Sequence, residues 1–232
     1  MTATQLAEVS GEEALARIER VLEQVGIGHA AVATDGDGTL WTHDVGEALF
    51  EALLRAGLVT EPAREALLAE ATGHGVDVPA RATAAEIAEA LFRAYVARRF
   101  PEDRMCAAMS WCMAGMSQDA LATFSTDLLE HTFGLRSRLI PESIRVLRAM
   151  GERGLPVWLV SASPRAVVEA AAAIVADETG VAVPRVIAMT PRIVDGFVTP
   201  ETDGRWPYGE GKRLALESVL GGRVLAVAMG DN

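Results

Sequence analysis

Hydrophobic positions along this chain follow two spacings that alternate from one segment to the next. Residues 10–26 carry apolar side chains at the intervals of an amphipathic helix, with Ser10 and Glu13 in the register of a capping box. The run HAAVAT at 29–34 is apolar almost throughout, which is typical of a strand buried on both faces of a parallel sheet. We therefore expect a helix followed by a buried strand in this part of the chain.

The same alternation returns later in the sequence. Helices are expected at 141–154, 164–176 and 211–222, and strands at 155–163, 183–190 and 223–231. Ser163 is a suitable N-cap for the helix that has Pro164 at its first position. The pair Asp195-Gly196, within 192–199, predicts a two-residue hairpin turn.

The stretch between the first strand and this second region contains only helical periodicity and helix breakers. Helices are expected at 45–57, 62–71, 83–99, 106–116 and 117–133. Strands that alternate with helices predict an α/β fold, a doubly wound, Rossmann-like parallel sheet with right-handed crossovers. We expect a core domain formed by 1–43 and 134–232, and an inserted all-helical cap domain at 44–133 over the carboxyl edge of the sheet.

Composition excludes several classes of partner. The formal charge of −11 argues against nucleic acid or an anionic membrane as the main partner. No apolar run reaches membrane-spanning length and the N-terminus lacks a signal-peptide pattern, so a cytoplasmic location is expected. The two cysteines, Cys106 and Cys112, form no CxxC motif, and neither a disulfide framework nor a structural zinc site is expected.

Candidate chemistry begins in the stretch AVATDGDGTLWTHD, which follows the first strand and carries Asp35 and Asp37. A calcium loop of the EF-hand type would need glycine at its sixth position and glutamate at its twelfth, and these are Leu40 and Gly46. Aspartate and glycine are also ordinary turn residues. From these two acids alone, a plain turn and a catalytic metal site both stay open.

Polar residues at the other strand ends favour the metal site. The second expected strand ends at Ser161 and the last at Asp231, and the carboxyl ends of parallel strands share one edge of a sheet. Carboxylates gathered there repel one another unless a cation lies among them, and an all-oxygen site suits Mg²⁺. The chain has 20 arginines and a single lysine, Lys212, which precedes the last strand and can neutralise a phosphoryl group.

Four short segments resemble the ordered motifs of one superfamily. DGDGTLW, VSAS, GEGK and MGDN look like the four motifs of the haloacid dehalogenase superfamily, and the likeness covers nearly the whole chain. The helical insertion after the first motif is similar to that of the phosphoserine-phosphatase-like branch, which has a helical cap. GEGK is not a nucleotide-binding P-loop, since Trp206 and Arg213 occupy positions where that motif needs glycine and Ser or Thr.

The resemblance implies a role for each motif residue. Asp35 is the expected nucleophile that forms an aspartyl-phosphate, and Asp37 the expected general acid and base. Ser161 and Lys212 are expected to bind the phosphoryl group, with Lys212 also holding the Asp35 carboxylate. Mg²⁺ is expected to bind Asp35, the backbone carbonyl of Asp37, and Asp231. Dehalogenases of the superfamily lack the second aspartate, so Asp37 favours phosphoryl transfer.

The implied activity is that of a Mg²⁺-dependent phosphatase acting on a small-molecule phosphate ester. A phosphotransferase or phosphomutase on the same scaffold, or a non-catalytic binding protein of this fold, are the alternatives. The family's fourth motif normally carries another acid a few residues after the first, whereas this sequence stops at Asn232 within the motif. We therefore expect the core domain to be truncated at this end.

Residues next to the motifs leave alternatives open. Asp44 lies where phosphoserine phosphatases have an acid that recognises the substrate's amino group, but it can equally cap the helix that begins at Val45. Asp44 and the nearby aromatics suggest an amine-bearing substrate such as phosphoserine or phosphocholine. Trp41 is expected to pack at the cap hinge or to meet a quaternary ammonium. The role of His43 stays open.

A few further side chains are expected to lie in the core or beside the site. Helical spacing favours a place in the core of the cap, more than in a ligand site, for Trp111 and the methionines at 105, 109, 113 and 116. Tyr208 and Arg205, in the loop before the last helix, are candidates for contact with the substrate.

Overall fold

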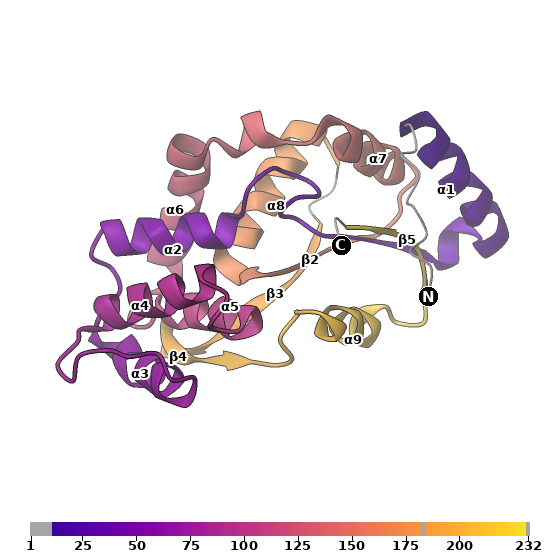
Figure 1. Cartoon of the computed structure of the whole chain (residues 1–232). Coiled ribbons are helices and arrows are strands. Elements are labelled where there is room, and N and C mark those ends of the chain that lie inside the picture. The colour runs from indigo at the N-terminus through magenta and orange to yellow at the C-terminus, as the bar shows by residue number, and fades with distance from the viewer. Residues whose placement is uncertain (1–10, 182–183, 231–232) are drawn as a thin grey trace.

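The computed structural model describes residues 11–181 and 184–230, and within them a five-stranded sheet has helices on both faces (Figure 1). The strands are β1 Ala30–Thr34, β2 Val157–Pro164, β3 Arg185–Val194, β4 Phe197–Asp203 and β5 Val224–Met229. Their order across the sheet is β4-β3-β2-β1-β5. Only β4 runs antiparallel to its neighbour, so the prediction of a doubly wound α/β fold is confirmed.

Helices occupy most of the remaining described chain. They are α1 Gly11–Val25, α2 Val45–Arg55, α3 Arg64–Gly73, α4 Ala84–Val96, α5 Glu102–Trp111, α6 Gln118–Asp127, α7 Pro141–Glu152, α8 Arg165–Thr179 and α9 Glu210–Val219. Short 3₁₀ turns lie at Ile27–His29, Glu61–Ala63 and Leu135–Arg138, and a π-helical turn at Leu128–Phe133 continues α6. Helices α1, α7 and α8 cover one face of the sheet and α9 covers the other (Figure 1).

Strand β1 is the centre of the core because it is buried on both faces. Every residue of β1 is buried, and its side chains alternate between two hydrophobic clusters. Ala30 and Val32 join the larger cluster, whereas Ala31 and Ala33 face Leu216 of α9. A strand that is buried on both faces has apolar side chains at successive positions, which is why the sequence of β1 shows no alternation.

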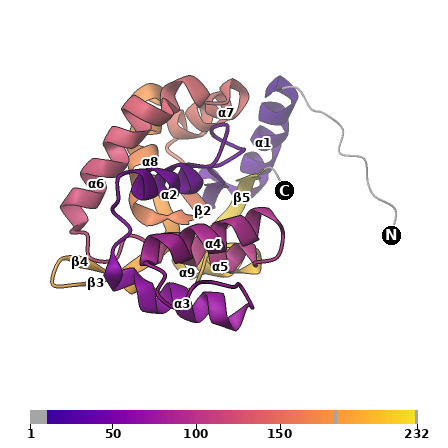
Figure 2. The same cartoon turned by 60° about the vertical axis from the view of Figure 1, so that its left-hand side comes forward.

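Helices α2 to α6 form a block beside the carboxyl ends of the strands, most clearly in Figure 2. Side-chain caps set the starts of α2 and α4: Asp44 accepts a hydrogen bond from the Glu47 amide, and Thr83 forms a capping box with Glu86. Helix α5 packs on β2 and β4, and one hydrophobic cluster runs without a break from this block into the core. The block is therefore packed directly on the sheet edge.

The segment after α5 differs from the prediction. A helix was expected to continue to Met116, but α5 ends at Trp111, and residues 115–118 instead pair with β4. The amide of Gly115 donates to the Val198 carbonyl at 2.9 Å, and the Val198 amide donates to Met116 at 2.9 Å. The prediction is wrong here because an exposed strand edge offers these backbone groups partners that helical periodicity does not reveal.

The predicted hairpin is confirmed, but the predicted cap of α8 is wrong. Asp195 and Gly196 have φ values of 51° and 81° between β3 and β4, as a two-residue turn of this kind requires. Ser163 and Pro164 belong to the end of β2, and the Ser163 side chain does not cap α8. Its hydroxyl is bound elsewhere, in the site described below.

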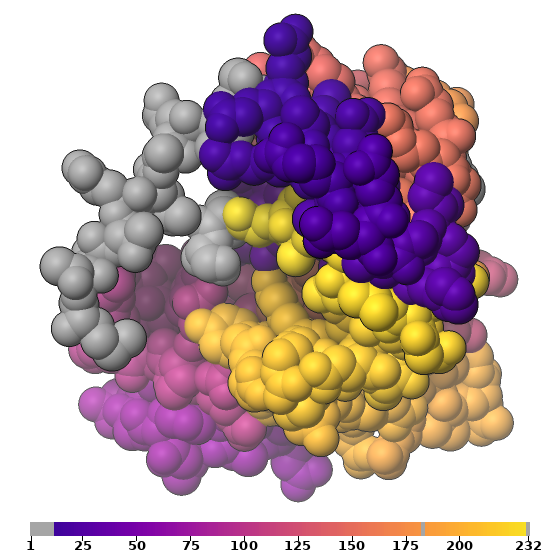
Figure 3. Space-filling view, turned by 90° about the vertical axis from the view of Figure 1, so that its right-hand side faces the viewer, coloured from indigo at the N-terminus to yellow at the C-terminus, as the bar shows by residue number. Residues whose placement is uncertain are grey.

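Helix α1 lies at the end of the molecule opposite the helical block. It packs on α7 and beside β5, as the indigo and yellow surfaces in Figure 3 show. The Ser10 part of the expected capping box lies outside the described residues. None of the helices in the described ranges is both long and apolar enough to cross a membrane.

Candidate active site

The loop that follows β1 begins at the point where the order of the strands reverses. β2 lies on one side of β1 and β5 on the other, and such switch points are where sheets of this type bind ligands. The Asp35 amide donates to the Met229 carbonyl at 2.9 Å, so Asp35 extends the pairing of β1 with β5. The chain then turns at Gly36, where a Cβ would lie 2.5 Å from the Trp41 ring. Only glycine fits this turn.

Asp35 is paired with the single lysine of the chain. Lys212, in the first turn of α9, places its Nζ 2.5 Å from Asp35 Oδ2, and the Gly36 amide donates to Oδ1 at 2.8 Å. The Asp35 side chain is 15% exposed and that of Lys212 31%, so the pair is sheltered but open to the cavity. A carboxylate held this way has one fixed orientation, and the ammonium beside it can also meet an anion.

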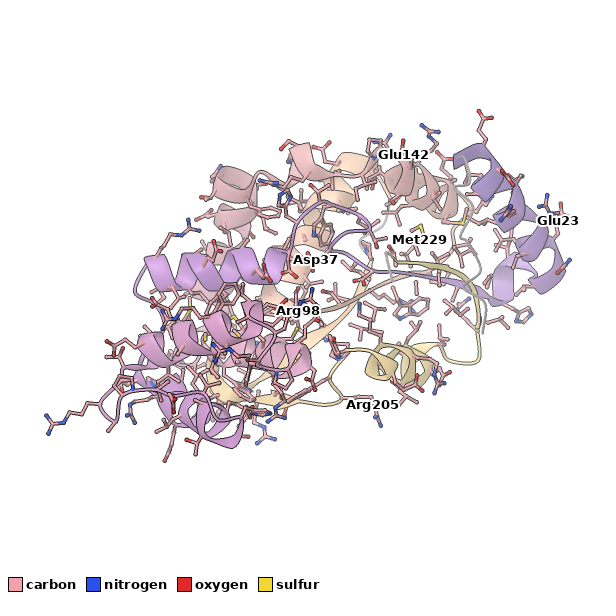
Figure 4. All side chains as sticks on the ribbon, viewed as in Figure 1. Glu23, Asp37, Arg98, Glu142, Arg205 and Met229 are labelled. Atoms are coloured by element: carbon pink, nitrogen blue, oxygen red, sulfur yellow. The ribbon has the colours of Figure 1, made fainter. Side chains whose placement is uncertain are left out.

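Asp37 has a different environment, made only of neutral donors. Trp41 Nε1 and the Val45 amide donate to Oδ1 at 2.7 and 2.8 Å, and the Ser163 hydroxyl donates to Oδ2 at 2.9 Å. These three donors come from the loop, the start of α2 and the end of β2. A Cβ on Gly46 would lie 2.8 Å from Ser163 Oγ, so glycine lets α2 approach β2 closely enough. Figure 4 shows Asp37 in this position between the sheet and the helical block.

The surroundings of Asp37 raise its pKa from 3.8 to about 7. Burial is the largest cause, because it penalises the charged carboxylate, and the nearby Asp44 carboxylate adds to it. The hydrogen bonds from Val45, Trp41 and Ser163 lower the pKa of Asp37, but they offset only part of this increase. A carboxyl with a pKa near neutrality can both give and take a proton.

Ser161 and Asp44 lie on the same cavity. Ser161 is 1% exposed, and its oxygen accepts a hydrogen bond from the Ser163 amide at 3.0 Å, which leaves its own proton free to donate. Asp44 caps α2 through the Glu47 amide at 2.8 Å. Asp44 also lines the cavity, so the two readings that its sequence position left open are compatible.

The cavity has a volume of about 560 Å³ and lies between the strand ends, α5 and the loop before α9. It is lined by Asp35, Asp37, Asp44, Glu102, Cys106, Ser161, Ala162, Ser163, Tyr208, Gly209 and Lys212. The structure thus brings together four predicted residues from three separate motifs, together with Asp44. Asp231, the remaining predicted metal ligand, lies outside the described residues.

The oxygen atoms in the described part of this site suit Mg²⁺. The Asp35 carboxylate faces the cavity, and none of the described hydrogen bonds within loop 35–45 is accepted by the Asp37 carbonyl. Both are the hard oxygen donors that Mg²⁺ takes. No group of three or more His, Cys, Asp or Glu side chains in the described ranges could hold a metal by itself. A site with few protein ligands is usual for Mg²⁺, which keeps waters and takes substrate phosphate.

Several residues that sequence reasoning assigned otherwise, or missed, contribute to the site. Ser163 was expected to cap a helix, although its two-residue spacing from Ser161 puts both on one face of β2. Trp41 is fully buried and donates to Asp37, so the expectation that it packs is confirmed. The alternative contact with a quaternary ammonium is wrong, because the ring is not available to a ligand. Glu102 was not singled out, and no sequence signal places it here.

The remaining candidates divide between cavity, core and surface. Tyr208 lines the cavity and Arg205 does not. His43 is exposed, and its Nδ1 lies 2.9 Å from Arg138 Nη1. Trp111 is buried in the hydrophobic core together with Met105, Met109 and Met113, so the core reading of this series is confirmed. Both cysteines are free thiols.

Comparison with known proteins identifies the family. The model of the haloacid dehalogenase-like hydrolases matches residues 32–232, and the chain belongs to this family. A search of curated proteins returned no match.

Solved structures with TM-scores above 0.5 share the fold at low sequence identity. A protein of unknown function from Bordetella pertussis Tohama I is 22% identical with a TM-score of 0.55, over 85% of this chain and 76% of its own. A conserved, functionally unknown protein from Anaerococcus prevotii DSM 20548 is 16% identical with a TM-score of 0.62, over 100% and 81%. A probable phosphoserine phosphatase from Vibrio cholerae is 12% identical with a TM-score of 0.46, over 96% and 59%. Function must therefore be argued from the site.

The raised pKa of Asp37 predicts a pH-dependent effect of Asp37→Asn on stability. Because the folded protein holds this proton up to about pH 7 and the unfolded chain only to about pH 4, wild-type stability falls as pH rises between these values. This difference between the two pKa values corresponds to about 4 kcal/mol of unfolding free energy at most. In metal-free buffer with EDTA, Asp37→Asn should therefore gain stability relative to wild type between pH 5 and pH 8.

Urea unfolding at the two pH values measures this effect. Asp77→Asn, an exposed aspartate on a surface loop, is the matched control and should show no such gain. If the difference in unfolding free energy between Asp37→Asn and wild type stays constant from pH 5 to pH 8, the raised pKa of Asp37 is contradicted.

Proposed function

We propose that this hydrolase is a Mg²⁺-dependent phosphatase that hydrolyses a small phosphomonoester through phosphorylation of Asp35. The observation that carries the proposal is the contrast between two carboxyls of one loop. Asp35 is paired with an ammonium, whereas Asp37 is shielded among neutral donors with a pKa near 7. Two carboxyls kept in such different environments can take separate roles as nucleophile and acid–base catalyst.

In the first step, an Asp35 carboxylate oxygen bonds to phosphorus as the bond from phosphorus to the leaving oxygen breaks. Asp37 gives its proton to that oxygen, so the alcohol departs neutral. Ser161 and Lys212 donate hydrogen bonds to the phosphoryl oxygens, where negative charge develops. These groups line the same cavity, which supports their acting on the same phosphoryl group.

In the second step, water attacks the phosphorus of the aspartyl-phosphate. Asp37, now ionised, takes a proton from this water, and the bond between phosphorus and the Asp35 oxygen breaks. Phosphate is released and both carboxyls return to their first state. The proton that Asp37 lost is regained from water, so the cycle needs no other reagent.

Mg²⁺ would be held by the Asp35 carboxylate, the Asp37 carbonyl and Asp231. When bound, it offsets the negative charge of the phosphate and the carboxylates. The Asp37 side chain is unsuited to be a ligand, because both of its oxygens already accept hydrogen bonds. This leaves the Asp37 carboxyl free for proton transfer.

We further propose that residues 44–133 act as a cap domain on the core formed by 1–43 and 134–232. The cap would choose the substrate, because Glu102 and Cys106 of α5 line the cavity opposite the strand ends. Asp44 supports a substrate with an amine, since the carboxylate is half-buried and faces this cavity. The leaving group would lie between Asp44 and helix α5.

Substitution of the charged pair tests the proposal. Asp35→Asn should abolish Mg²⁺-dependent release of phosphate from p-nitrophenyl phosphate, and Lys212→Met should lower kcat by about 10²–10³-fold, as loss of a transition-state donor does. Arg213→Gln is the matched control: it is the next residue of α9, but it pairs with Glu210 and Glu217 on the surface. Phosphate release that survives Asp35→Asn would overturn the proposal.

Removal of the metal gives a separate prediction. EDTA should abolish activity, Mg²⁺ should restore it and Ca²⁺ should not, because Ca²⁺ prefers more ligands at longer distances. Mg²⁺ should also raise the Tm of wild type, since it binds only the folded chain. This shift, measured by differential scanning calorimetry, should disappear in Asp35→Asn; an unchanged shift would place the metal elsewhere.

A further inference from the structure

One part of the active-site cavity, its leaving-group end, is formed by residues that the reaction does not use. Glu102 and Cys106 come from the start of α5, Tyr208 and Gly209 from the loop before α9, and Asp44 from the start of α2. If the phosphoryl group lies against Asp35 and Ser161, the rest of the substrate must extend to this end. Its chemistry therefore decides which leaving group fits.

Trp206 anchors the residues that form this end of the cavity. Its Nε1 donates to Thr202 Oγ1 at 2.8 Å, the Arg104 guanidinium lies 4.9 Å from the ring centroid, and the Trp111 ring packs edge-on at 6.5 Å. Trp206 thus joins the loop that carries Tyr208 to helix α5, which carries Glu102. These contacts connect the two sides of this end of the cavity.

The charge at this end is negative and unbalanced. Lys212 is the only basic residue among the described ones that line the cavity, and it is paired with Asp35. Burial is the largest cause of the raised pKa of Asp44, and the nearby charge of Glu102 adds a smaller contribution. The Tyr208 hydroxyl also lies against Glu102. A positive group placed between Asp44 and Glu102 would relieve this repulsion.

Two kinds of amine-bearing leaving group fit this end poorly. A carboxylate beside the amine, as in phosphoserine, would face Asp44 and Glu102 without a basic partner among the described lining residues. A quaternary ammonium has no N–H to donate and needs aromatic faces around it. Tyr208 is the only aromatic residue among the described lining residues, and Trp41 is fully buried.

We propose that the leaving group is a short amino alcohol with an N–H-bearing ammonium and no carboxylate, bound by Asp44 and Glu102. Glu102 is the specificity-determining residue, because Asp44 already accepts a hydrogen bond from the Glu47 amide at the start of α2. This inference rests on the proposed phosphatase activity and names its substrate class.

Four phosphate esters test the inference on the whole chain: O-phosphoethanolamine, ethyl phosphate, O-phosphoserine and p-nitrophenyl phosphate. Wild type should show kcat/KM at least about tenfold higher for O-phosphoethanolamine than for ethyl phosphate, because the ammonium adds charge-assisted hydrogen bonds. It should also prefer O-phosphoethanolamine to O-phosphoserine.

Glu102→Gln separates specificity from catalysis. It should lower kcat/KM for O-phosphoethanolamine about tenfold more than kcat/KM for p-nitrophenyl phosphate, and it should reduce the preference for O-phosphoethanolamine over O-phosphoserine. Glu65→Gln is the matched control, because Glu65 lies in the first turn of cap helix α3 but not at the cavity. Thermal melts of both variants confirm folding.

The outcomes distinguish this inference from the proposed function. Hydrolysis of p-nitrophenyl phosphate without a preference for O-phosphoethanolamine over the other two alkyl esters would overturn the inference alone. An equal loss on all four esters in Glu102→Gln would also overturn it. If wild type hydrolyses none of the four, the proposed function fails, and the inference fails with it.

Discussion

The three hydrogen bonds that hold the Asp37 carboxyl are the constraint on which the rest of the site depends. They come from Trp41 in the loop, the Val45 amide at the start of α2 and Ser163 at the end of β2. One side chain thus ties together the motif loop, the entry to the helical block and the neighbouring strand. The same contacts fix where α2 begins and where a proton is held over the sheet edge.

The cost of this arrangement is a carboxyl kept away from water, and the proposed mechanism uses this carboxyl for proton transfer. Burial raises the pKa of Asp37, while its neutral donors stabilise the carboxylate only in part. Two residues earlier in the same loop, Asp35 meets the Lys212 ammonium instead. The two carboxyls therefore differ in environment because they face different elements. Asp35 faces α9, whereas Asp37 faces α2 and β2.

Much of the fold and part of the site could be predicted from the sequence. The uninterrupted apolar run of β1 and the return of strand-helix alternation after residue 141 define the sheet, and parallel strand ends bring Asp35, Asp37 and Ser161 to one edge. Lys212 stood out because it is the only lysine in an arginine-rich chain. These signals are local or follow from topology.

The missed residues depend on tertiary contacts that no local pattern records. Ser163 precedes a proline and a helix, which favours a cap, yet its hydroxyl reaches a loop 126 positions earlier. Trp41 reads as a core aromatic, and its indole N–H becomes important only because the loop folds back on Asp37. Glu102 looks like any acid in a first helical turn, and its place at the cavity follows from how α5 packs on β2 and β4.

The central claim is that Asp35 accepts the phosphoryl group and Asp37 moves the protons. Pre-steady-state hydrolysis of p-nitrophenyl phosphate by Asp37→Asn, with Mg²⁺ present, tests it most directly. Nitrophenolate leaves without a proton, so Asp35 should still be phosphorylated, whereas water lacks its base in the second step. We predict a burst approaching one nitrophenol per enzyme, then slow turnover, with phosphate bound covalently at Asp35. Slow release without a burst or bound phosphate, or turnover at the wild-type rate, would contradict the account.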